Sequence, residues 1–389
     1  MIIANFMDSS LKDLETKGVL SSAPEIYNPR KHFDRVLHFT PHAGDLALQP
    51  LFDEWHVTLI HYPAAYLGPI KILKAAFQIW RRMKKEQVDL VRGRLPYLGS
   101  LIACLCARLQ KLPFVVSLGG DNRIVQERNG TYNYNSRLIS YAMEWLVLKL
   151  ALRIIAPNQF TKSYVEGIIG KHGADCKCVI IPWISTPIPE SVDSPPNIFK
   201  KLDIPSTSAI VPIIGFLNAY KYADVLFDAL DGLNLQTKNG QKVIFCFCGD
   251  GPLRPEGEKR FSKATHVRFF GWQERSIVHA LLRHAEFVLI PMSGNVLMEA
   301  ASIGKPVITS EVEWHSELVI NRKSGLVVDP HEPSTWRRAI NEMLASPNLA
   351  KQMGEQLKQR YWADYAPDRS IDLEFDLYKR LIQSQSVQT

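Results

Sequence analysis

The sequence has few cysteines and lacks the short motifs that identify the commonest nucleotide and metal sites. Its six cysteines form three C-x-C pairs, and none has the C-x-x-C spacing of a zinc knuckle or a redox motif. No segment matches the P-loop, the zinc motif H-E-x-x-H, or a full G-x-G-x-x-G after the first predicted strand. A D-x-D pair, which could hold nucleotide-bound Mg²⁺, is also missing. These absences exclude a P-loop enzyme, disfavour a dinucleotide oxidoreductase and predict no metal site.

Long hydrophobic runs are absent too. The longest apolar stretch, residues 145–156, is interrupted by Lys149 and Arg153, so it is too short and too charged to span a bilayer. The N-terminus carries acids early and has no long apolar core, which makes it a poor signal peptide. We therefore expect a cytoplasmic protein that could contact the inner membrane face peripherally.

Length and charge narrow the class of protein further. A chain of 389 residues is long for one domain, so two domains are expected. The net charge of +7 favours an anionic partner, and nucleic acid, a membrane surface and a phosphorylated ligand all qualify. Nucleic acid is disfavoured because no known reader motif accompanies the charge.

Short apolar runs that alternate with helical segments predict a parallel α/β sheet in each half of the chain. In the first half these runs are 35–40, 57–60, 88–91, 114–117, 153–156 and 179–181. In the second half they are 210–214, 243–247, 267–269, 287–290, 307–308 and 325–328. Alternate residues of a strand share a face, so Cys176/Cys178 and Cys246/Cys248 are predicted to lie in a core.

The predicted fold is therefore α/β, with two doubly wound Rossmann-like domains facing across a cleft. Residues 1–34 are interpreted as an N-terminal extension of uncertain structure, followed by the first domain over 35–186. The proline-rich segment 187–205 is predicted to be a linker, and the second domain covers 206–368. A C-terminal helix over 369–389 could pack back on the first domain.

The stretch from Phe287 to Ser310 contains the strongest local signal for a site. Its pattern predicts a buried strand, a tight polar turn, a helix that ends before Gly304, and a second buried strand. The turn leaves free backbone N–H groups at the helix N-terminus, where a phosphate is held well. Glu299 lies near that N-terminus.

Glycine-bearing turns follow three strands of the second half, at Gly215, at Gly249 with Gly251, and at Gly294. A single glycine turn is weak evidence, but three at the same sheet edge indicate one ligand site. Lys221 supplies a cation where a diphosphate needs neutralising, although a lone lysine is more often a solvated surface residue.

The second half resembles the retaining glycosyltransferases of family four, the "glycosyl transferases group 1" type with the GT-B fold. The matching segments are Gly215-x-Leu217 with Lys221, Phe247 to Pro252, Val267-x-Phe-x-Gly271, Asn295 to Ala300, Gly304 to Ile308, and Glu317 with Gly325 to Val328. The first half matches more loosely, through Pro41-x-x-Gly44, 108–117, 153–156 and 179–182.

The resemblance implies roles for individual residues. Lys221 would neutralise the diphosphate, Glu299 would hydrogen-bond the ribose, and Asp121 would act on the acceptor side, although Asp121 reads equally well as a turn residue that caps a helix. The residues expected to contact the donor are Gly44, Gly215, Gly249, Gly251, Trp272, Gly294, Asn295, Val296 and Leu297.

The same resemblance implies the reaction. A sugar would pass from a nucleotide diphosphate sugar to a glycan or lipid-linked acceptor in cell-surface polysaccharide or glycolipid biosynthesis, without a metal or an organic cofactor. Two departures keep alternatives open: Pro291 replaces a family glutamate, and Phe216 replaces a family arginine. The alternatives are a nucleotide-sugar epimerase or hydrolase on the same fold, and a donor-site-impaired homologue that acts as a binding partner.

A basic segment, residues 71–85, mixes lysines and arginines with apolar and aromatic residues at helical spacing. It reads either as an ordinary amphipathic helix packed on the sheet or as a helix that rests on an anionic membrane surface. The latter would suit a lipid-linked acceptor.

Overall fold

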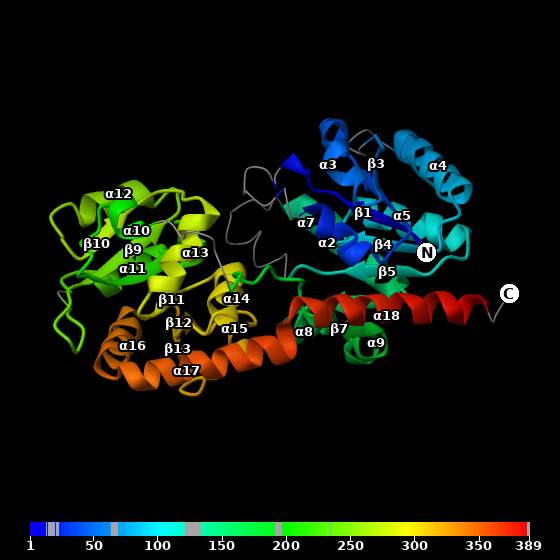
Figure 1. Cartoon of the computed structure of the whole chain (residues 1–389). Helices are drawn as coiled ribbons and strands as arrows, with labels where there is room; N and C mark the ends of the chain where they lie inside the picture. Colours follow the sequence, from blue (N-terminus) through cyan, green and yellow to red (C-terminus); the bar gives the residue numbers. More distant parts are fainter. Residues whose placement is uncertain are drawn as a thin grey trace. The chain divides into compact units, whose positions relative to one another are not determined.

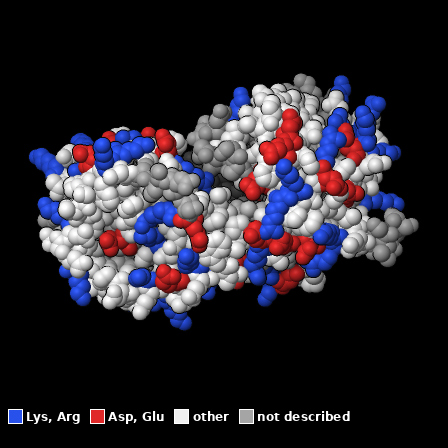
Figure 2. Space-filling model, viewed as in Figure 1, with Lys and Arg blue, Asp and Glu red and all other residues white. Residues whose placement is uncertain are grey.

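The computed structural model describes residues 1–12, 14, 20, 23–63, 69–120, 134–190, 197–233 and 235–386. The chain divides into two compact units, and Figure 1 shows that each contains both helices and strands. Unit 1 contains residues 1–184 and 368–389, and unit 2 contains residues 185–367. On the face shown in Figure 2, basic and acidic side chains are interspersed, so the net positive charge is not gathered there.

Unit 1 is built on a seven-stranded sheet in the order β3-β2-β1-β4-β5-β6-β7, and all of its strand pairs are parallel. The chain moves outward from β1 to β3 and then returns past β1 to β4, which is the doubly wound arrangement. The strands are β1 (Ile2–Met7), β2 (Arg35–Thr40), β3 (Val57–His61), β4 (Leu90–Arg94), β5 (Phe114–Ser117), β6 (Arg153–Ala156) and β7 (Cys178–Ile180).

Strand β1 was not expected from the sequence, which placed the first strand at 35–40. It lies between β2 and β4, so part of the presumed extension is a central strand. Asn5 interrupts its apolar run, yet Asn5 is buried and its Nδ2 lies 2.7 Å from Nδ1 of His38 on β2. Burial lowers the pKa of His38 to about 3, so this pair is uncharged near neutral pH.

Helices cover both faces of the unit 1 sheet (Figure 1). Residues of α4, α5, α7, α8 and α9 share one core with the sheet, and residues of α2, α3 and α18 share the other. The helical segments are α2 (Ala23–Tyr27), η2 (Pro29–Lys31), η3 (Ala43–Leu48), α3 (Gln49–Asp53), α4 (Pro69–Lys85), α5 (Leu98–Leu109), α7 (Tyr134–Leu150), α8 (Gln159–Ile169), α9 (Lys171–Lys177) and α18 (Pro367–Ser386).

One of the two predicted core cysteine pairs was wrong. Cys246 and Cys248 are buried in β9, but Cys176 is exposed near the end of α9 and only Cys178 enters a strand. The helix extends to Lys177, so the two residues do not share a strand face. Among the described residues, no helix combines the length and apolar character needed to cross a membrane.

Unit 2 has a six-stranded sheet in the order β10-β9-β8-β11-β12-β13, also parallel throughout. Its strands are β8 (Ala209–Ile214), β9 (Val243–Cys248), β10 (Val267–Phe269), β11 (Val288–Ile290), β12 (Val307–Ser310) and β13 (Leu326–Val328). Its helical segments are α10 (Ile198–Lys201), η4 (Ala219–Lys221), α11 (Ala223–Leu230), α12 (Arg254–Arg260), α13 (Arg275–His284), α14 (Gly294–Ser302), α15 (His315–Leu318), α16 (Pro333–Ala345), α17 (Pro347–Arg360) and the π-helical turn η5 (Tyr361–Tyr365).

The segment predicted as a linker, 187–205, is partly folded. Ile198 of α10, together with Leu202 and Ile204, is buried in a core cluster with Ile210 and Ile244 of the sheet. Residues 191–196 lie outside the described residues. The five prolines of this segment predicted an interdomain linker, but the apolar residues in its second half form part of the core of unit 2.

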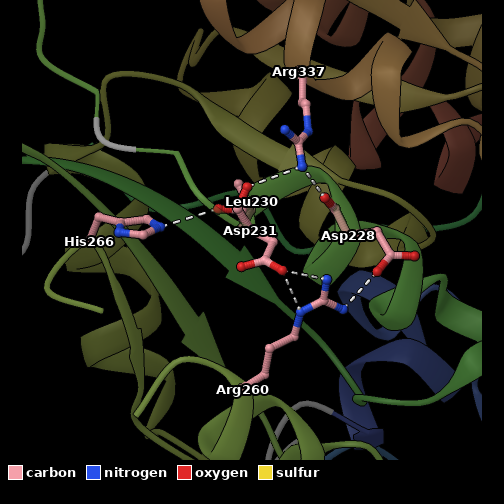
Figure 3. A network of polar contacts seen from close by, with 6 residues as sticks. All are labelled: Asp228, Leu230, Asp231, Arg260, His266 and Arg337. Carbon is pink, nitrogen blue, oxygen red and sulfur yellow. Dashed lines mark hydrogen bonds and ion pairs between the residues drawn. The ribbon is translucent and has the colours of Figure 1, made fainter. Parts of the chain in front are cut away.

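An arginine network fixes the C-terminal end of α11 in unit 2 (Figure 3). Arg260 of α12 binds the carboxylates of Asp228 at 2.6 Å and Asp231 at 2.9 Å. Arg337 of α16 donates to the backbone carbonyls of the same two residues, at 2.6 and 3.1 Å. Carbonyls at a helix C-terminus lack intrahelical partners, and an arginine there satisfies them and offsets the helix dipole.

Helix α18 is held to unit 1 by apolar packing and by one buried ion pair. Leu377, Tyr378 and Leu381 lie in the same core cluster as residues of β1, β2 and β4. Arg92 on β4 binds Glu374 on α18 at 2.6 Å, and their side chains are only 9% and 12% exposed. Breaking such a pair leaves a charge buried without its partner.

We therefore expect Glu374→Ala to destabilise unit 1 by about 3–5 kcal/mol, because the Arg92 guanidinium stays buried without its carboxylate. Chemical denaturation followed by tryptophan fluorescence measures the change. The matched control is Glu342→Ala, which removes the partner of Arg322, an arginine that is 67% exposed. That variant should lose less than about 1 kcal/mol. Equal losses in the two variants would contradict a special role for the buried pair.

Candidate functional site

The loops that follow β8 and β9 pack backbone against backbone at the carboxyl edge of the unit 2 sheet. A Cβ atom added to Gly249 would lie 1.8 Å from the carbonyl oxygen of Gly215, and one on Gly251 would lie 2.3 Å from that of Leu217. The N–H of Leu217 donates to Asp250 O at 2.9 Å. Gly249 and Gly251 are therefore required by this close approach, and they bring two of the predicted glycine turns together.

Two exposed aromatic side chains flank these loops. Phe216 is 54% exposed and Trp272 is 61% exposed, and both follow strand ends at this edge. The N–H of Gly249 donates to Gly271 O at 2.8 Å, which places the Trp272 loop against the glycine turn. Large aromatic side chains left in solvent are typical of a binding surface and can stack on a planar ring. From the sequence, Phe216 was noted only as the residue that replaces a family arginine.

Lys221 ends the short helix η4 directly after the β8 loop. The side chain of Asn218 caps this turn by accepting the N–H of Lys221 at 2.9 Å. The next residue, Tyr222, has φ of 55° and packs in a small cluster with Met292 and Val312. This cluster brings the Lys221 loop beside the turn that precedes α14. The ammonium lies 5.0 Å from the ring centre of Tyr220.

Helix α14 begins at Gly294, as the sequence predicted within two residues. The N–H groups of Gly294, Asn295 and Val296 have no acceptor among the residues that the structure describes, as expected for a first helical turn. The N–H of Leu297 instead donates to Ser293 O at 3.1 Å. The open donors are therefore those of residues 294–296, and Leu297 does not offer one.

Glu299 lies one turn further along α14 and is buried. Its Oε1 accepts a hydrogen bond from Nη2 of Arg275 at 2.9 Å and lies 3.7 Å from Nε2 of His279. Both partners are on α13. Neither partner could be predicted from the sequence, because the contact joins two different helices. Arg275 thus orients the carboxylate that the family resemblance assigns to the ribose.

A buried histidine, His315, forms a hydrogen bond with Thr309 on β12. The hydroxyl of Thr309 donates to Ile290 O at 2.8 Å, so its oxygen accepts from Nδ1 of His315, 2.7 Å away. Burial, followed by the charge of Lys221, lowers the pKa of His315 to about 3. The imidazole is therefore neutral and joins α15 to Thr309 on β12, whose hydroxyl in turn joins β12 to the end of β11. No sequence motif marked it.

Two further predicted residues belong to the first half of the chain. Asp121 lies outside the described residues. Gly44 belongs to unit 1, where it is exposed in η3 just after β2, and a Cβ on it would lie 3.3 Å from Nζ of Lys12. In the part of the chain that the structure describes, no three His, Cys, Asp or Glu side chains gather as they would around a metal ion.

Comparison with known proteins finds a matching protein family for each half of the chain. Residues 195–360 match the family "Glycosyl transferases group 1", and residues 30–182 match "Glycosyltransferase Family 4". A D-inositol 3-phosphate glycosyltransferase from Salinispora tropica is 28% identical over 192 residues, which are 46% of this chain and 40% of that relative. The match thus spans less than half the length of that relative.

Solved structures agree on the fold. A glycosyltransferase from Rickettsia africae has a TM-score of 0.76 at 17% identity, with 98% of each chain covered. Anabaena Alr3699/HepE, solved with UDP and glucose, has a TM-score of 0.73 at 16% identity over the whole of both chains. Two parallel Rossmann-like sheets with this strand order match the GT-B fold, and the chain belongs to the family-four glycosyltransferases.

Proposed function

We propose that the chain is a retaining, metal-independent hexosyltransferase that uses a nucleotide diphosphate sugar as donor. The observation that carries this proposal is the open N-terminus of α14 beside the Lys221 loop, at an edge that also exposes Phe216 and Trp272. Such an edge offers donors and a cation for a diphosphate and flat side chains for a base.

The chemistry follows from where charge develops. Cleaving a glycosyl–phosphate bond builds negative charge on the departing diphosphate, and fixed N–H donors with one lysine stabilise that charge. In the proposed site the N–H groups of residues 294–296 and the ammonium of Lys221 take this role. Gly215, Gly249 and Gly251 shape the loops around the nucleotide, and Glu299, oriented by Arg275, holds the ribose.

The first test is donor binding. We expect UDP or another nucleoside diphosphate to raise the melting temperature of the protein, and the corresponding nucleotide sugar to be consumed in the presence of an acceptor. UDP heads the panel because the Anabaena neighbour was solved with UDP and glucose. Both effects should persist in EDTA, since the cation is supplied by the chain. If no UDP, GDP or ADP species shifts the melting temperature, the enzyme proposal fails.

Lys221 provides a sharper test. Lys221→Ala should lower kcat by about 100–1,000-fold, because one stabilising cation is lost where charge develops. Steady-state transfer assays measure the change. Lys263→Ala, which removes an exposed lysine of the same unit, should keep full turnover. A Lys221→Ala enzyme with normal kcat would show that the diphosphate lies elsewhere.

The alternatives make different predictions in the same assays. An epimerase or hydrolase on this fold would consume the nucleotide sugar without any acceptor. A donor-site-impaired homologue would bind its partner and leave every nucleotide sugar intact. Phe216 and Pro291 are the residues that favour this last alternative, since each replaces a polar residue of the family pattern.

The acceptor is proposed to be a glycan or lipid-linked molecule of cell-surface polysaccharide or glycolipid synthesis, used at the inner membrane face. Helix α4 supports this because it carries two apolar faces. Ala75, Ile79 and Met83 are buried in unit 1, whereas Leu73 and Phe77 are 69% and 60% exposed. Exposed basic residues adjoin the outer face, namely Lys74, Arg81, Lys84 and Lys85. A helix of this kind can rest on anionic lipid.

Leu73→Ser combined with Phe77→Ser should reduce sedimentation with phosphatidylglycerol vesicles by at least about tenfold, because the outer apolar face loses its contact with the acyl boundary. The control replaces Leu46 and Leu51, which are exposed leucines of unit 1 outside α4. That variant should sediment like the unmodified protein. Unchanged sedimentation of the α4 variant would remove this helix from the proposal.

A further inference from the structure

Unit 1 contains a basic pocket of about 580 Å³ at the edge where β5 and β6 begin, opposite to the carboxyl ends of the strands. The helices α5, α7 and α9 end beside it. Five cationic residues line it: Arg108, Lys111, Lys149, Arg153 and Lys177. Among the described residues that line it there is no aspartate or glutamate.

The charges of this basic pocket are not neutralised within the part of the chain that the structure describes, where none of the five forms an ion pair with a carboxylate. They also act on one another. Burial and the charge of Lys149 lower the pKa of Lys177, and Arg153 and Arg108 lower it further. Several like charges around one hollow favour a multivalent anion as the missing counter-charge.

The helix ends beside the pocket explain the presence of only some of its five cationic residues. A cation near a helix C-terminus is stabilised by the helix dipole, which can place one such residue at each helix end. Lys177 has a clear structural role, because its ammonium donates to Lys149 O at 2.6 Å and to Ala151 O at 2.9 Å. The side chains of Arg108, Lys111 and Lys149 are exposed, and none of them makes a comparable hydrogen bond to another described residue.

We propose that this basic pocket binds a phosphate-bearing anion, separately from the nucleotide-sugar site of unit 2. The ligand chemistry is a phosphoryl group with more than one contact to lysine or arginine, as found in a phospholipid headgroup or in free pyrophosphate. Leu152 lines the pocket and Leu109 adjoins it, and both are exposed, at 39% and 76%. Exposed leucines beside cations favour the headgroup of an anionic lipid.

The test compares two variants of equal charge. Lys111→Ala with Lys149→Ala removes two exposed cations of the pocket, and Lys259→Ala with Lys263→Ala removes two exposed lysines of unit 2. Sedimentation with vesicles of phosphatidic acid and phosphatidylcholine gives one affinity, and titration with inorganic pyrophosphate gives another. At about a fivefold loss for each surface lysine, the pocket variant should bind vesicles roughly thirtyfold more weakly. The unit 2 variant should change by less than about twofold.

The two arms separate the sources of phosphate. Pocket-dependent binding to vesicles without pyrophosphate binding identifies a lipid headgroup, and pocket-dependent pyrophosphate binding identifies a free phosphate ligand. Either result supports the site. Equal binding by the two variants in both arms would overturn it. The melting temperature without ligand should be the same in both variants, which shows that folding is intact. Neither arm measures donor binding or sugar transfer, so this test is independent of the proposed transferase activity.

Discussion

The proposed donor side of this protein depends on the contact between two loop backbones at one sheet edge. Gly249 and Gly251 let the β9 loop reach the carbonyls of Gly215 and Leu217, where any side chain would collide. The hydrogen bonds across that contact leave the neighbouring Phe216 and Trp272 pointing into solvent. Because the strands are parallel, the α14 N-terminus opens at the same edge. The two glycines thus allow the loop packing on which the other proposed donor contacts depend.

Unit 1 differs in that polar residues of its sheet are buried and each is paired with another polar residue. Asn5 and His38 occupy neighbouring central strands, and Arg92 reaches across to Glu374 on the last helix. Each group would be costly to bury alone, and its partner offsets that cost. Since α18 comes from the far end of the chain, the ion pair and the apolar residues around it make the C-terminus part of unit 1.

Much of this arrangement could be predicted from the sequence, and the polar contacts that were missed share one cause. Twelve strands follow from short apolar runs, and the glycine turns follow from their position after those runs. Strand β1 was missed because Asn5 breaks its apolar run, and its partner His38 is more than thirty residues away. Arg275 and His315 were missed for the same reason, since their contacts with Glu299 and Thr309 exist only after the helices and strands have packed. Local patterns identify elements, but they do not reveal which polar groups meet.

The two anion sites proposed for this chain rest on opposite ends of helices, and this difference has consequences for selectivity. At α14 the backbone itself supplies positive potential, so the proposed diphosphate site needs only one lysine beside three N–H groups. At the basic pocket of unit 1 the helix C-termini supply negative potential, which would repel an anion unless several cations outweigh it. Five cations line that pocket, more than three helix ends need for their own carbonyls. In such a site the side-chain cations must overcome the negative potential of the helix ends, so it should favour multivalent phosphate. Its affinity should fall steeply as the salt concentration increases, because the attraction comes from side-chain charges near the surface.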